Sequence, residues 1–259
     1  LPRQARNLPQ TDSFYGIGRG PDRAVLVEEP QDAFARRVEV IRTAQSTLDV
    51  CYHCVKSGET TECFFAELLR AADRGVRVRV LLDGTVGGLS GARSNIALAL
   101  RAHPNIEYRI YNPVDLLRPW EWNALLHDKF ILADDRMLLL GGRNIGDEYF
   151  APPGYEGAVT YDRDVLVLND LAGTPDSSES VTAQAKIYMD TLWDAPETDR
   201  FGTLSASRRA DGLAAQEYLK ETAARWEAAA PSFYLPSEPA SQCAVPTQRV
   251  TLLHNPVSP

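Results

Sequence analysis

Apolar and polar positions follow two periods in turn along the first half of the chain. Spacings of three and four residues, typical of one buried helix face, predict helices at 33–43, 62–74 and 95–102. Alternating or continuous short apolar runs predict strands at 48–55, 76–82 and 106–111. Helices that alternate with strands are typical of an α/β fold with largely parallel strand pairing.

The second half of the chain begins with a predicted β-hairpin. Two apolar runs at 125–133 and 137–140 flank the polar pair Asp134-Asp135, which favours a turn. The remaining pattern predicts a strand at 163–168, helices at 181–193 and 206–229, a Pro- and Ser-rich linker at 231–246, and the start of another strand at 250–253.

His127 and Lys129 lie two residues apart in the first run of this hairpin. On a strand they point to the same face, so an imidazole and a cation would stand side by side. The pair suits a phosphate ester, because the ring can attack or transfer a proton while the cation holds negative oxygens. Asp134 falls on the other face or in the turn itself, and we assign it to the turn.

Together with Gly141, Gly142 and Asn144, these residues spell H-x-K-x4-D followed by G-G-x-N. This string resembles the HKD signature of the phospholipase D superfamily. The wider string GGRNIGDEYF, at 141–150, is similar to the bacterial cardiolipin synthase-like and phosphatidyltransferase branch. The resemblance covers 26–193 and implies an α/β/α sandwich around a central mixed sheet. Gly142 stands where many members have Ser, so that hydroxyl is missing here.

The resemblance also implies a two-step phosphodiester reaction without a metal, so no cofactor is expected. His127 would attack phosphorus and form a phosphohistidine, while Lys129 and Asn144 would hold the non-bridging oxygens. Asp162 matches the position where the family tends to keep a carboxylate that orients the histidine ring, and Asp164 is the alternative.

Four further residues have both a functional and a structural interpretation. His53 would either line the pocket or be a partly buried histidine whose ring nitrogens have hydrogen-bond partners within the fold. Asp83 ends a strand at the edge where α/β sites collect, but an Asp-Gly turn explains it equally well. Trp120 and Trp122 would rim a lipid entrance or pack internally.

Composition narrows the choice of partners. The 259 residues are 44% hydrophobic and 24% charged, as in a globular chain, and the net charge is -8. This acidic balance disfavours a broad nucleic-acid interface and passive adsorption to anionic lipid. The pair Cys51 and Cys54 lacks the second pair of a zinc site, so we interpret the cysteines as small buried hydrophobes.

No apolar run approaches the length of a membrane span, which takes about 20 residues. We expect a bacterial protein in the cytoplasm or peripherally on a membrane. Because the sequence begins at Leu1, an N-terminal signal or anchor ahead of it stays open.

The resemblance also implies a second histidine, which protonates the leaving alcohol and belongs to a second H-x-K. None of the other histidines in this sequence is followed by Lys at that spacing. We therefore expect an extended arm at 1–22, one phospholipase D-like lobe at 23–195, and a helical connector at 196–259 leading toward a second lobe. A homodimer that completes the site across a two-fold axis is the alternative. As one lobe of two, this chain alone would be nearly inactive.

The leading hypothesis is a phosphatidyltransferase or phosphodiesterase that acts on phospholipids. A homodimeric phosphodiesterase or nuclease is the first alternative. A non-catalytic phospholipid-binding domain with a degenerate site is the second, although His127, Lys129 and Asn144 are all intact.

Overall fold

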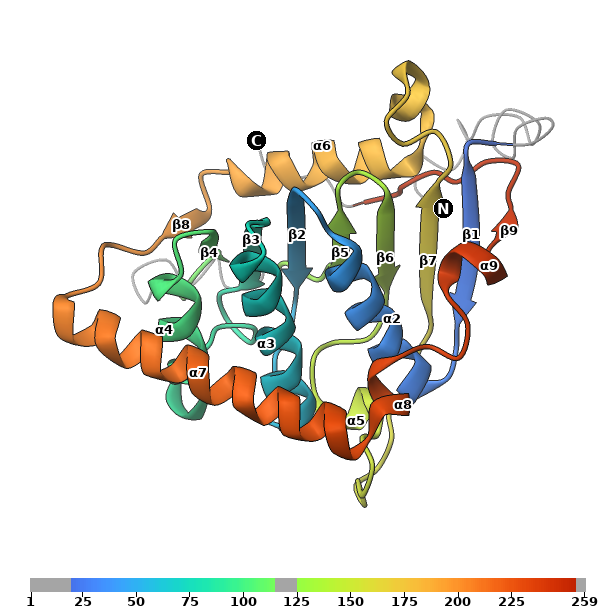
Figure 1. The fold of residues 1–259 in the computed structure, drawn as a ribbon. Coiled ribbons are helices and arrows are strands. Elements are labelled where there is room, and N and C mark those ends of the chain that lie inside the picture. Colours follow the sequence, from blue (N-terminus) through green and yellow to red (C-terminus); the bar gives the residue numbers. More distant parts are fainter. Residues whose placement is uncertain (1–19, 115–124, 255–259) are drawn as a thin grey trace, which may run out of the picture.

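A mixed β-sheet forms the centre of the computed structural model, which describes residues 20–114 and 125–254 (Figure 1). Across these residues the sheet has nine strands in the order β8-β4-β3-β2-β5-β6-β7-β1-β9. The strands are β1 (Asp22–Val27), β2 (Thr47–Tyr52), β3 (Arg77–Asp83), β4 (Ile106–Tyr111), β5 (Lys129–Ala133), β6 (Met137–Gly141), β7 (Asp164–Asn169), β8 (Thr198–Arg200) and β9 (Val245–Pro246).

The sheet is parallel only across β2, β3 and β4, whose connections each contain a helix. A helical crossover returns the chain to the same end of the sheet, so consecutive strands run in one direction. The tight β5–β6 connection instead reverses the chain, and the pairs β2–β5, β6–β7, β1–β7, β4–β8 and β1–β9 are antiparallel as well.

Helices cover both faces of the sheet (Figure 1). They are α2 (Pro30–Thr43), α3 (Glu59–Asp73), α4 (Ser94–Ala102), α5 (Asp147–Phe150), α6 (Val181–Trp193), α7 (Ala206–Ala229), α8 (Pro231–Tyr234) and α9 (Ala240–Cys243), with 3-10 turns at Gly91–Arg93 and Pro175–Glu179. One apolar core lies between the sheet and α2, α3 and α4, and a second lies under α6. The predicted α/β/α sandwich with a central mixed sheet is therefore confirmed.

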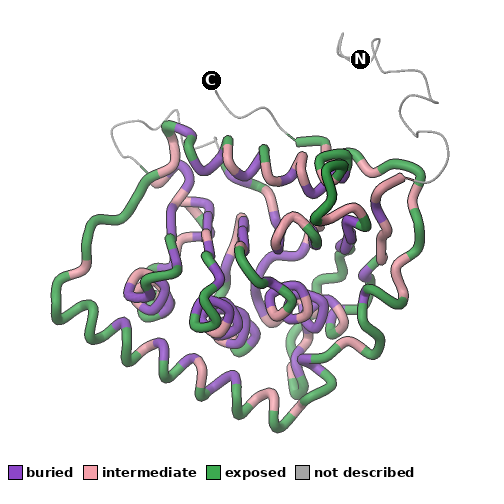
Figure 2. Tube along the Cα trace, turned by 45° about the horizontal axis from the view of Figure 1, so that its top comes forward, coloured by how far each residue is buried: buried purple, intermediate pink, exposed green. Residues whose placement is uncertain are grey.

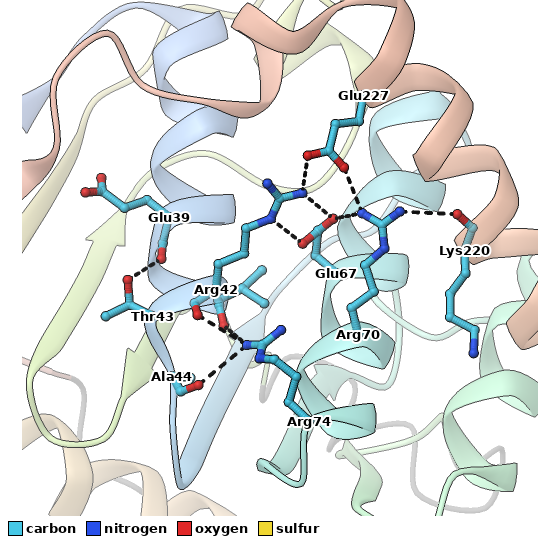
Figure 3. A network of polar contacts seen from close by, with 10 residues as sticks. Glu39, Arg42, Thr43, Ala44, Glu67, Arg70, Arg74, Lys220 and Glu227 are labelled. Carbon is cyan, nitrogen blue, oxygen red and sulfur yellow. Dashed lines mark hydrogen bonds and ion pairs between the residues drawn. The ribbon is translucent and has the colours of Figure 1, made fainter.

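Helix α7 lies across α3 and α4 as an outer layer. Most of it is exposed, and its buried positions recur on the side that faces those helices (Figure 2). Gly212 allows the closest approach, because a Cβ there would lie 2.5 Å from the Leu98 carbonyl oxygen. At the other end, the buried Glu67 accepts from Arg42 and Arg70, and both arginines also pair with Glu227 of α7 (Figure 3).

Several element boundaries were predicted correctly, among them 106–111, 181–193 and 206–229. Others differ. Strand β1 was not expected, and no strand forms at 250–253. The predicted arm at 1–22 falls largely on residues 1–19, which lie outside the described part of the chain.

Residues 196–254, expected as a connector, pack onto the lobe itself. Strand β8 pairs with β4, and β9 pairs with β1. The linker predicted at 231–246 is wrong, because Phe233 and Tyr234 are buried and the Phe233 ring stacks on Phe34 at 4.5 Å between centroids. A second lobe stays a prediction.

Candidate active site

The sequence-predicted site residues gather at one edge of the sheet. Strands β2 and β3 end there, β5 begins there, β6 ends there, and β7 begins there. The pairings Tyr52 with Lys129 and Gly141 with Asp164 mark this edge. Antiparallel pairing of β5, β6 and β7 thus brings together segments that are far apart in sequence.

His127 does not belong to a strand, contrary to the predicted run at 125–133. Strand β5 begins only at Lys129, so the alternation of side chains does not extend back to His127. His127 is exposed, whereas Lys129 is buried and its Nζ donates to the His127 carbonyl oxygen at 2.5 Å. The two residues are neighbours through this bond rather than through strand parity.

Two side chains hold the backbone of Leu126, the residue before His127, one at its N–H and one at its carbonyl. The Leu126 N–H donates to the buried Asp83 carboxylate at 2.9 Å, and the Leu126 carbonyl accepts from His53 Nδ1 at 2.9 Å. The carbonyl can only accept, so His53 carries its proton on Nδ1. The His53 ring also lies 4.6 Å from the His127 ring, centroid to centroid. Asp83 and His53 therefore fix the position of His127, a role that the sequence alone did not reveal.

The surroundings of His127 favour its neutral form. Burial lowers the pKa of its ring, and the nearby Lys129 and His53 lower it further. A neutral ring has a free nitrogen lone pair, which a nucleophile needs. Burial also lowers the pKa of Lys129, against the opposing effect of the Asp128 and Asp162 carboxylates.

Asn144 is held by hydrogen bonds on both sides of its amide. Its Oδ1 accepts from the Cys54 N–H at 3.0 Å, and its Nδ2 donates to the Tyr149 hydroxyl at 3.2 Å. A parallel bridge between Val55 and Ile145 ties the same two segments together. One N–H of the amide remains to donate to a ligand.

Gly142 lies directly under the Asp162 carboxylate. A Cβ at this position would come within 2.2 Å of Asp162 Oδ1, so this carboxylate fills the space of a larger side chain. Asp162 is exposed and accepts from the Arg163 N–H at 2.8 Å. Its charge partly offsets the lowering of the Lys129 pKa by burial. Among the described residues, no hydrogen bond links Asp162 to the His127 ring.

Asp164 is not a second solvated carboxylate beside Asp162. It is fully buried, and its Oδ2 accepts from Arg37 and Arg143 at 3.0 Å each. Gly141 makes room for it, because a Cβ there would lie 2.0 Å from Asp164 Oδ1. Asp164 therefore holds the buried guanidinium groups of Arg37 and Arg143, whereas Asp162 stays exposed above Gly142.

Asp134 lies at the far end of β5 from His127, in the β5–β6 turn. Its φ is +50°, and its carboxylate accepts from the backbone N–H groups of Gln45, Ser46 and Thr47 at 2.5–2.8 Å. These bonds tie the turn to the start of β2. Trp120 and Trp122 lie outside the described residues.

No cluster of His, Cys, Asp and Glu side chains in residues 20–114 and 125–254 has the arrangement of a metal site. Within the same ranges, no helix combines the length and apolarity that crossing a bilayer requires.

The protonation of His127 can be tested directly. We expect its ring to titrate below the ordinary imidazole pKa in NMR spectra, where only four histidines contribute. In the His53→Asn variant the pKa of His127 should rise, because the His53 ring no longer buries His127 or repels its protonated form. The Asn amide can still donate a hydrogen bond to the Leu126 carbonyl. A His103→Asn variant, altered at the opposite sheet edge, should leave the value unchanged. Titration at or above the ordinary value in the unmodified chain would contradict this account.

Comparison with known proteins adds a family context to this geometry. The domain family described as "Cardiolipin synthase, PLD-like domain" matches residues 38–167. Cardiolipin synthase C of Escherichia coli K12 is 39% identical over 152 residues, which cover 55% of this chain and 31% of that protein. The chain thus spans less than a third of that relative.

Two solved structures share the fold. Nuc from Salmonella typhimurium, described as a phospholipase D family member, superposes with a TM-score of 0.51 at 16% identity, covering 70% of this chain and 99% of Nuc. Phosphatidylserine synthase of Haemophilus influenzae gives a TM-score of 0.53 at 16% identity, covering 78% of this chain and 44% of the synthase. At these identities the likeness supports the fold and no finer conclusion.

Proposed function

The chain belongs to the phospholipase D superfamily, in its cardiolipin synthase-like group, and we propose that it transfers or hydrolyses phosphodiesters of phospholipids through a phosphohistidine. The observation that carries this proposal is the His127 ring, which is exposed at the sheet edge, has its pKa lowered by burial, and is positioned through Leu126.

The first step would be attack of the His127 ring nitrogen on phosphorus. A P–N bond forms, the P–O bond to the leaving alcohol breaks, and that oxygen takes a proton from a second histidine. Lys129 and the free N–H of Asn144 would hold the non-bridging oxygens, whose negative charge a cation and an amide donor stabilise. In the second step water or an alcohol would attack phosphorus, give its proton to the second histidine and release His127.

Asp162 is the proposed orienting carboxylate, acting at the Lys129 side of the site. Its position above Gly142 supports this proposal, because it brings negative charge to Lys129. The Asp162 carboxylate would stabilise the positive charge that the His127 ring carries while it is bonded to phosphorus.

The second histidine would come from a second H-x-K, because this chain contains one such motif. A second lobe in the same polypeptide is the arrangement we favour, and a homodimer partner is the alternative. In either arrangement the exposed His127 would face the other half of the site across the sheet edge.

Phospholipid is the favoured substrate class. The chain carries a net charge of -8, which does not suit the polyanionic backbone of DNA. Its 39% identity to a cardiolipin synthase points the same way, whereas the likeness to Nuc rests on the fold alone. A nuclease activity remains the second candidate through that shared fold.

A parallel assay of the complete protein, with both histidines present, separates these substrates. We expect headgroup exchange or release on phosphatidylglycerol vesicles and no cleavage of single- or double-stranded DNA. Cleavage of DNA without turnover of lipid would replace this proposal by the nuclease. Binding of vesicles with no turnover of either substrate would identify a non-catalytic domain.

A further inference from the structure

A hollow lies at the carboxyl ends of β3 and β4. It encloses about 440 Å³ and is bounded by the loop after β3, by α4, and by the first turns of α7. The ribbon in Figure 1 labels these helices and strands. Gly84 and Thr85 on its wall directly follow Asp83, whose carboxylate holds Leu126 next to His127. The hollow and the site therefore share one edge of the sheet.

Three guanidinium groups line this hollow, which we name the arginine pocket after Arg93, Arg101 and Arg208. Among the described residues that line it, Asp211 is the one carboxylate, so this lining carries a net positive charge in a chain whose net charge is -8. Within the described part of the chain, no hydrogen bond or ion pair reaches the side chains of Arg93 and Arg208.

The arginines of this pocket repel one another. Burial lowers the pKa of Arg101, and the charge of Arg208 lowers it further. Arg101 is anchored, since its Nη2 donates to the Gly202 carbonyl at 2.8 Å, so it cannot swing away to relieve the repulsion. A bound anion would offset it, and guanidinium groups match the oxygens of a phosphate in pairs.

Apolar side chains make up part of the wall, beside the hydroxyl groups of Thr85, Ser90, Ser94 and Tyr108. Leu89, Ile110 and Phe201 line the hollow, and the Phe201 ring lies 4.7 Å from the Arg101 Cζ. Phe201 is 40% exposed, which leaves apolar surface for a ligand. A cationic centre beside such a surface suits an amphiphile, with its anionic group on the arginines and its apolar part on the wall.

We propose that the arginine pocket binds the phosphate of an anionic phospholipid headgroup other than the one that His127 attacks. This assignment rests on the proposed function for its choice of a lipid. A second lipid held there would have its headgroup on the same sheet edge as the reacting phosphorus, which would favour a lipid alcohol over water as the acceptor.

The test is a binding measurement that requires no turnover. Short-chain phosphatidylglycerol, kept below its micelle concentration, is titrated into the chain at low ionic strength by calorimetry. The double variant Arg93→Gln/Arg208→Gln is expected to bind about tenfold or more weakly, because two charge-assisted contacts are lost. Arg209→Gln is the matched control, with the same chemistry on the next residue of α7 outside the pocket, and should bind as the unmodified chain does.

Two further arms identify the ligand and its place. The His127→Ala variant should bind the lipid as well as the unmodified chain, and loss of binding in it would place the lipid at His127 and overturn the proposal. Equal binding by the double variant and Arg209→Gln would overturn it too. Inorganic phosphate should bind more weakly than the lipid, and equal affinity would refute the lipid assignment. Each of these failures leaves the chemistry proposed for His127 standing, since turnover is not measured.

Discussion

Replacing His127 by Ala is expected to lower phospholipid turnover by the complete protein by about ten-thousand-fold or more. The neutral ring provides the nitrogen that bonds to phosphorus, and a methyl group offers no substitute nucleophile. Headgroup exchange on phosphatidylglycerol vesicles, measured at saturating substrate, gives the loss as a change in kcat. The fold should survive, because the His127 side chain is exposed.

His103→Gln is the matched control for this variant. His103 lies at the opposite edge of the sheet, before β4, where its Nε2 lies 3.1 Å from the Asp73 carboxylate. Turnover by the His103→Gln protein should match that of the unmodified protein. If His127→Ala retains a comparable rate, His127 is not the nucleophile.

The second large effect concerns stability. Replacing Asp164 by Asn should lower the free energy of unfolding by about 3–5 kcal/mol, because Arg37 and Arg143 would be left buried without their anion. Both guanidinium groups are fully inside the protein, so water cannot replace the carboxylate. Urea denaturation of the chain measures the change.

Asp162→Asn is the control for that measurement, because it makes the same change two residues away at an exposed position. Its free energy of unfolding should stay within about 0.5 kcal/mol of the unmodified chain. Equal losses in the two variants would show that the buried ion pairs do not stabilise the fold.

The two carboxylates also show where sequence reasoning ends. Asp162 and Asp164 lie two residues apart at the start of a predicted strand, and both were predicted as candidates for orienting the histidine. Their environments differ because the partners of Asp164 come from α2 and from the GGRN segment, 127 and 21 residues away in sequence. Such partners follow from the three-dimensional fold and not from local pattern.

Local pattern worked where the periodicity was regular. The helix at 181–193 and the strand at 106–111 were predicted with their observed bounds. Strand β1 escaped prediction because DRAVLV does not alternate and follows a Pro- and Gly-rich stretch, and its place in the sheet depends on its pairing with β7. Tertiary burial of Phe233 and Tyr234 likewise overrode the Pro-rich composition around them.

At the site, the string from His127 to Asn144 predicted which residues would gather but not how. Strand alternation was applied to His127, yet the peptide before it is held by the side chains of Asp83 and His53 and not by a strand ladder. A side-chain bond of this kind has no periodic signature. His53 and Asp83 were noted as candidates, and only the structure joins them to His127.

The most direct test of the account is a search for phosphate on His127 itself. The complete protein is mixed with phosphatidylglycerol labelled in its phosphate, quenched in alkali, where a P–N bond to histidine survives, and digested for peptide mapping. We expect an acid-labile glycerophosphoryl group, which is what the phosphatidyl adduct becomes when alkali removes its acyl chains, on the peptide that carries His127 and none on the His127→Ala protein. Turnover of lipid with no such adduct in the unmodified protein, under conditions that trap early reaction times, would contradict it.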